Sequence, residues 1–150
     1  MNETCEKAEA FLTELVADLR FDLSVSAQRT DEGCWLNLTG KDVDFLLGEN
    51  GEMLDAFETL LFQIYGRDLE RAERFICDAE GFRQTRKAEL QAMARFAAQN
   101  VRKNGRPFTF GVLNSTERRA IHLVLQAEED LITESVGAGR DRRLQVRIKN

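Results

Sequence analysis

The chain has 150 residues, of which 43% are hydrophobic and 31% charged, and its net charge at pH 7 is −5. These values predict a folded protein with one modest core or two small ones. No segment approaches the roughly 18 apolar residues of a membrane span, and the acidic start differs from a secretory signal, so we expect a cytoplasmic protein without membrane insertion. The three cysteines, Cys5, Cys34 and Cys77, lack the paired spacing of a zinc site or a disulfide framework, and we expect reduced thiols.

The charge changes sign along the chain. Residues 1–80 carry 7 Lys and Arg against 19 Asp and Glu, whereas residues 81–150 carry 14 against 7. A basic half can attract phosphate groups, while an acidic half repels them or faces another protein. The asymmetry favours nucleic acid as a partner, and the alternative is that the charges only solvate helical surfaces.

The first half predicts six elements in the order α-β-β-α-α-β. Apolar residues at helical spacing predict a helix over 6–20, and alternating residues on either side of the turn at 31–33 predict a hairpin with strands at 23–27 and 35–39. A short turn or helix follows at 40–47. Leu54, Phe57, Leu61 and Ile64 repeat at three and four residues and predict a helix over 52–65, and residues 74–79 are typical of a strand.

The second half predicts the order α-β-α-β-β. An apolar stripe predicts a long helix over 82–103 that ends before Gly105, and residues 108–113 are typical of a strand. Asn114 can cap the next helix together with Glu117 three residues later, and strands are expected at 131–136 and 144–148. Because no flexible linker separates the halves, we expect the long helix to join them rigidly in an α+β protein.

Two glycines flank the tetrapeptide Gly48-Glu49-Asn50-Gly51 between two predicted helices. Glycines let a backbone turn tightly and approach a sugar-phosphate chain, and the following helix presents free N–H groups. The segment resembles the GXXG loop of KH domains, and the element order matches the type II arrangement, which clamps a single strand. Glu49 and Glu52, however, would face a phosphate, so either the loop still binds RNA or it keeps only the turn.

Arg118 and His122, the one histidine of the chain, stand four residues apart in the helix after Asn114. This spacing places both side chains on one helix face, where they can meet the same anion. Arginine forks suit phosphate geometry and stack on unpaired bases. The alternative for His122 is a half-buried structural residue. We predict a nucleic-acid surface that comprises Arg118, His122, Arg119, Arg142, Arg143, Arg106 and Arg102.

Several further segments resemble the Jag family, also called KhpB, whose members pair a KH domain with an Arg-xxx-His domain. The resemblance is carried by Gly81-Phe82-Arg83 before the long helix, by Gly105-Arg106-Pro107, by the run from Glu117 to Leu123, by Glu134-Ser135-Val136-Gly137 and by Arg142-Arg143. It covers about residues 6–149, and the family's additional N-terminal domain is expected to be absent.

The resemblance implies an acidic, type II KH-like domain over residues 1–80 and a basic Arg-xxx-His domain over residues 81–150. It also implies sequence-tolerant binding of single-stranded RNA, with single-stranded DNA as a further ligand, and post-transcriptional regulation linked to cell-envelope growth. A KH-only protein or a second copy of the chain is the implied protein partner. The family's binding residues carry over as Arg118 and His122, and as Gly48 and Gly51 with an altered interior.

Two other classes of function compete with RNA binding. The chain can be a protein-interaction module whose acidic half pairs with a partner while the basic half is only solvated, and the carboxylates of Glu49 and Glu52 favour this. An enzyme is disfavoured, because one histidine, no metal-ligand cluster and no nucleophile beside a base leave no chemistry to assemble. We therefore expect no catalytic residue, no metal and no cofactor.

Overall fold

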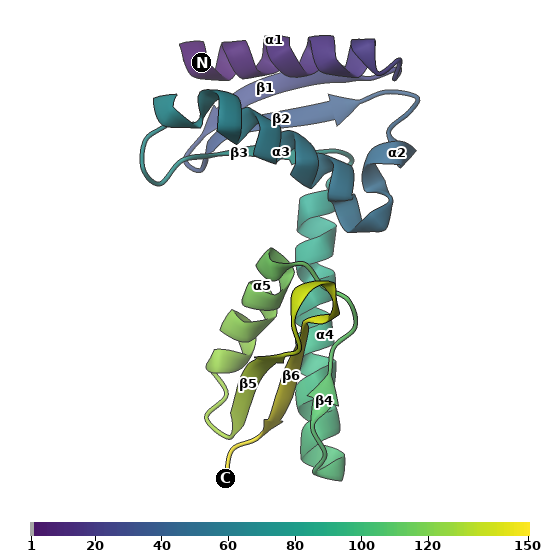
Figure 1. The fold of residues 1–150 in the computed structure, drawn as a ribbon, viewed down its shortest axis with the longest axis vertical. Coiled ribbons are helices and arrows are strands. Elements are labelled where there is room, and N and C mark those ends of the chain that lie inside the picture. The colour runs from purple at the N-terminus through teal and green to yellow at the C-terminus, as the bar shows by residue number, and fades with distance from the viewer. Residues whose placement is uncertain (1) are drawn as a thin grey trace. The chain divides into compact units, whose positions relative to one another are not determined.

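The computed structural model describes residues 2–150 and divides the chain into two compact units, Met1–Gln84 and Thr85–Asn150. We call them the N-terminal and the C-terminal unit (Figure 1). The long helix α4 (Phe82–Asn104) begins in the first unit and continues into the second. The protein is of the α+β class, as the sequence predicts.

The N-terminal unit contains the predicted order of helices and strands. Its elements are α1 (Glu3–Asp18), β1 (Ser24–Thr30), β2 (Gly33–Thr39), α2 (Asp44–Leu47), η1 (Glu49–Gly51), α3 (Glu52–Tyr65), η2 (Gly66–Asp68) and β3 (Arg74–Asp78). The sheet has the order β1-β2-β3, with β1 antiparallel and β3 parallel to β2. Leu36 and Leu38 of β2 are fully buried against α1 and α3, whose apolar stripes form the same core.

A disulfide between Cys5 and Cys34 corrects the expectation that all three cysteines are reduced. Cys5 lies on the buried stripe of α1, and Cys34 lies on the core face of β2, so the packing of this helix on the sheet brings their Cα atoms to 5.5 Å. The two residues are 29 positions apart, and their spacing therefore carried no signal of the pairing. Cys77 is free and buried, and burial raises the pKa of its thiol well above the ordinary value.

The C-terminal unit contains most of α4 and a small antiparallel sheet. Its other elements are β4 (Phe108–Thr109), α5 (Ser115–Gln126), β5 (Leu131–Val136), η3 (Gly139–Asp141) and β6 (Arg143–Ile148). The sheet order is β4-β6-β5, so β6 is the central strand. β4 is shorter than the strand predicted over 108–113, because after Phe110, whose N–H donates to the Leu144 carbonyl at 2.9 Å, the chain leaves the sheet at Gly111.

The core of the C-terminal unit lies between one face of the sheet and the two helices α4 and α5. Leu144 and Val146 of β6 are buried against Ile121 and Leu125 of α5 and against an alanine-rich stripe of α4. Small side chains let helices approach closely, which suits a unit of this size. The stripe comprises Ala94, Ala97, Ala98 and Val101.

Candidate nucleic-acid interface

The first turn of α5 is held by a capping box and by a buried ion pair. The Asn114 side chain accepts from the Glu117 N–H at 2.8 Å, and the Glu117 carboxylate accepts from the Asn114 N–H at 3.3 Å, as the sequence predicts. Glu117 is only 7% exposed, and Arg86 of α4 donates to its carboxylate at 2.5 Å. A buried carboxylate is tolerated when it is paired in this way. The start of α5 is therefore fixed to α4.

Arg118 and His122 lie on the same side of α5, as predicted, and the structure shows what orients each of them. Arg118 Nη1 donates to the Leu113 carbonyl at 2.7 Å. A guanidinium has five N–H donors, and this bond uses one. The His122 ring contacts the Thr133 hydroxyl of β5 through Nδ1, and Nε2 has no hydrogen bond within residues 2–150. Both side chains are positioned by the fold and retain donors for a ligand.

The other predicted arginines fall into two groups. Arg119 is exposed on α5, and Arg142 and Arg143 stand where η3 leads into β6. Figure 1 shows the start of α5 and η3 at the same end of the C-terminal unit. Arg106 is also exposed, just beyond the last turn of α4.

Arg102 differs from these residues, because its guanidinium is already paired. It donates to both oxygens of Asp130 at 2.8 and 2.6 Å and to Glu128 at 3.0 Å. The hydrogen bonds from Arg102 lower the pKa of the Asp130 carboxyl. This pair stands near the end of the sheet where Leu131 faces Ile148, and Val136 and Arg143 are paired at the other end.

The two glycines of the predicted KH loop have different environments. Gly48 has φ −68°, and a Cβ there would meet nothing within 4 Å. Gly51 has φ +79°, and a Cβ there would lie 2.4 Å from the ring of Phe82. The second glycine is therefore required by packing against the first residue of α4, whatever the loop binds.

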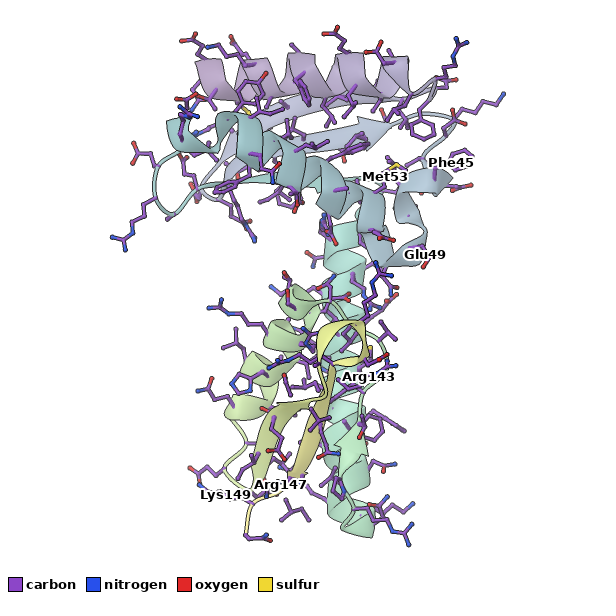
Figure 2. All side chains as sticks on the ribbon, in the orientation of Figure 1. Phe45, Glu49, Met53, Arg143, Arg147 and Lys149 are labelled. Carbon is purple, nitrogen blue, oxygen red and sulfur yellow. A yellow bond between two sulfur atoms is a disulfide. The ribbon has the colours of Figure 1, made fainter. Side chains whose placement is uncertain are left out.

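The interior of the loop is a left-handed turn with carboxylates beside it. Glu49 and Asn50 have φ values of 51° and 56°, a conformation that asparagine adopts more readily than glutamate. The Gly51 N–H donates to the Gly48 carbonyl at 3.0 Å, and the Glu52 N–H donates to Glu49, so two amides of the turn are already bonded. Glu49 is exposed at this turn (Figure 2).

Sequence reasoning missed the roles of Phe82 and Arg83. Arg83 donates to the Cys77 carbonyl at 3.0 Å and to Glu58 at 2.7 Å, and it pairs with Asp55 at 2.8 Å. Its basic side chain thus holds the start of α4 against α3 and β3 and is not a free cation. The signal in the sequence was the Gly81-Phe82-Arg83 segment itself, because a conformationally special glycine beside an aromatic residue often marks close packing.

The structure adds two observations about chemistry and membranes. Residues 2–150 contain no cluster of three or more His, Cys, Asp or Glu side chains that could hold a metal ion. Over the same residues, no helix combines the length and the apolar character needed to cross a bilayer.

Comparison with known proteins gives a consistent result. Residues 88–147 match the Arg-xxx-His domain family. The chain is 29% identical over 146 residues to the RNA-binding protein KhpB of Clostridium symbiosum, covering 96% of this chain and 66% of that protein. It is 27% identical over 146 residues to the RNA-binding protein KhpB of Bacillus subtilis (strain 168), covering 96% of this chain and 70% of that protein. The chain thus spans about two thirds of the length of these relatives.

Proposed function

Because the chain is a KhpB-like protein with an Arg-xxx-His domain over residues 88–147, we propose that it binds single-stranded RNA. The strand contacts the C-terminal unit through Arg118, Arg119 and His122 of α5, and it continues past Arg142 and Arg143. The proposed activity is non-catalytic and cytoplasmic. A role in post-transcriptional regulation linked to envelope growth follows from the Jag resemblance.

The observation that carries the proposal is the ion-pair pattern of the C-terminal unit. Arg86, Arg102 and Arg147 each meet a carboxylate within 4.0 Å. Among residues 2–150, Arg118 and Arg119 have no such partner, and neither do Arg142 and Arg143. Unpaired arginines on an ordered surface are available to phosphate groups, which supply most of the affinity for a nucleic-acid backbone.

A second candidate function is protein interaction through the N-terminal unit. Phe45 of α2 is 62% exposed and Phe62 of α3 is 59% exposed, and the carboxylates of Glu49 and Glu52 stand near the start of α3. Exposed aromatic residues in an acidic unit suit a protein surface better than a phosphate backbone. The partner would be a KH-domain protein or a second copy of the chain.

The test is the salt dependence of RNA binding by full-length variants. Arg118→Ala should weaken binding to an unstructured RNA of any sequence and make the slope of log affinity against log salt shallower by roughly 0.7, since one phosphate contact is removed. Arg95→Ala, at an exposed position of α4, is the matched control. If Arg118→Ala lowers only the melting temperature and leaves the slope at the control value, Arg118 holds the helix and does not contact phosphate.

A further inference from the structure

The sheet of the C-terminal unit has a second face that none of the unit's helices covers. Along β6, Leu144 and Val146 point to the core, so Arg143, Gln145 and Arg147 point to the opposite side. The Lys149 N–H donates to the Asp130 carbonyl at 2.8 Å, which extends the pairing of the strands and puts this side chain in the same row. Figure 2 shows Arg143 toward the η3 end of β6, and Arg147 and Lys149 toward the C-terminus.

The neighbouring strands add polar and apolar groups to this face. The register places Thr109 of β4 beside Gln145, whose Nε2 donates to the Thr109 hydroxyl at 3.1 Å. Ile132 and Val136 of β5 lie beside Arg147 and Arg143. The face therefore has a central basic row, with a hydrogen-bonding pair on one side and two aliphatic residues on the other.

We propose that this open face is a second contact surface for the phosphate backbone of a single-stranded nucleic acid. Alternate residues of a strand are about 6.6–6.8 Å apart, a spacing comparable to that of successive phosphates in an extended single strand. Arginine forks fit phosphate oxygens, and a neutral amide and hydroxyl can bond to sugar and phosphate groups. The proposal rests on the proposed function, because the same strand would pass from α5 along this row.

The α5 surface and the sheet face meet at one end of the unit. Arg143 begins β6 directly after Arg142, at the end where Figure 1 also shows the first turn of α5. A strand held by Arg118 can therefore reach Arg143 and then follow β6 toward Arg147 and Lys149. The expected footprint is longer than α5 alone could contact.

One carboxylate on this face opposes the proposed ligand. Glu134 of β5 lies opposite Gln145, and its Oε1 accepts from Arg147 Nε at 3.2 Å. Both side chains of this pair are partly exposed, at 35% for Arg147 and 46% for Glu134, so a phosphate can compete for the guanidinium. Glu134 should lower the affinity of this face, and its removal should raise it.

The experiment measures binding of the full-length protein to fluorescein-labelled oligouridylates of about 6 and about 15 nucleotides. Arg143→Ala combined with Arg147→Ala should weaken binding of the longer oligomer about five- to twentyfold and make its salt slope shallower by about 1.4. The shorter oligomer, which α5 alone can hold, should be affected less. Glu134→Gln should strengthen binding of the longer oligomer about two- to fivefold.

Matched controls separate a local contact from a change in net charge. Arg95→Ala removes one exposed cation of α4, and Glu129→Gln removes one exposed carboxylate of the turn before β5. Because Arg147→Ala also frees the Glu134 carboxylate, the Arg143 and Arg147 changes are repeated in the Glu134→Gln background, where the loss must persist. Melting temperatures of all variants identify any that do not fold, and Glu134→Gln tests the face without removing a cation.

The outcomes distinguish this inference from the proposed function. If the Arg143 and Arg147 variants bind like Arg95→Ala while Arg118→Ala still loses affinity, the sheet face is not a contact surface and RNA binding through α5 stands. If Glu134→Gln has no larger effect than Glu129→Gln, the inference is likewise overturned. If the unaltered protein binds neither oligomer, the proposed function fails and the inference fails with it.

Discussion

The two units carry opposite charges, and their arginines also have different surroundings. In the N-terminal unit, Arg29 pairs with Glu73, Arg74 with Glu32, and Arg83 with two carboxylates, so these cations link elements of the fold. In the C-terminal unit, unpaired arginines gather on α5 and at the start of β6. Net charge alone therefore understates the difference, since an arginine that is already paired offers little to a phosphate.

The two candidate binding elements differ in the same way. The loop from Gly48 to Gly51 keeps the shape of a phosphate clamp, but its second glycine accommodates Phe82 and its interior carries Glu49. On α5, each of Arg118 and His122 is oriented by one neighbour and retains further donors. Backbone shape and available charge are therefore separate requirements for binding a phosphate.

The largest expected effect concerns the disulfide, which only the N-terminal unit contains. Replacing Cys5 and Cys34 by serine should lower the free energy of unfolding of that unit by about 3–4 kcal/mol, because the unfolded chain regains the freedom that the crosslink removed. Trp35 of β2 is the one tryptophan of the chain, so its fluorescence follows this unit alone.

Amide NMR signals from α5 and β6 provide the matching measurement for the C-terminal unit. They should persist at temperatures where the Trp35 signal of the serine variant has changed. Simultaneous loss of both sets of signals would show that the two units unfold together, and the difference between them would then not extend to stability.

The next largest effect separates the two glycines of the loop. Gly51→Ala should lower the free energy of unfolding by about 2–3 kcal/mol, because alanine is strained at this positive φ and its Cβ would meet the Phe82 ring. Gly48→Ala is the matched control and should be nearly neutral, since its Cβ would lie in open space. Equal effects of the two changes in chemical denaturation would refute the packing role of Gly51.

A smaller effect concerns the carboxylates at the loop. Glu49→Lys combined with Glu52→Lys should raise RNA affinity about three- to tenfold if the loop faces the ligand, because two repulsive charges become attractive. Glu14→Lys combined with Asp18→Lys on α1 changes the net charge equally and is the control. An equal gain in both double variants would mean that only the overall charge matters and that the loop does not contact RNA.

The smallest effect is a pH dependence of the N-terminal unit. Burial raises the pKa of the Glu58 carboxyl above its ordinary value, although Arg83 lowers it in part. The folded state then binds this proton more tightly than the unfolded state, so the free energy of unfolding falls as pH rises from about 4.3 through the raised pKa. Glu58→Gln should remove that decrease, and a difference between the two proteins that stays constant with pH would contradict it.

Much of the local structure was determined by the sequence itself. The apolar spacing over 52–65 predicts α3 with the bounds that the structure has, and Asn114 with Glu117 predicts the capping box of α5. Both depend on residues within a few positions of one another. The split between an acidic and a basic half was likewise visible by counting, and so was the shared helix face of Arg118 and His122.

Only the tertiary structure decided which side chains are free and which are used by the fold. The Cys5–Cys34 disulfide, the contact of Gly51 with Phe82 and the pair of Arg86 with Glu117 each join residues about 30 positions apart. Periodicity and capping act over one or two helical turns and carry no information on such partners. Whether an arginine meets a carboxylate or remains available to a phosphate therefore depends on packing that brings distant elements together.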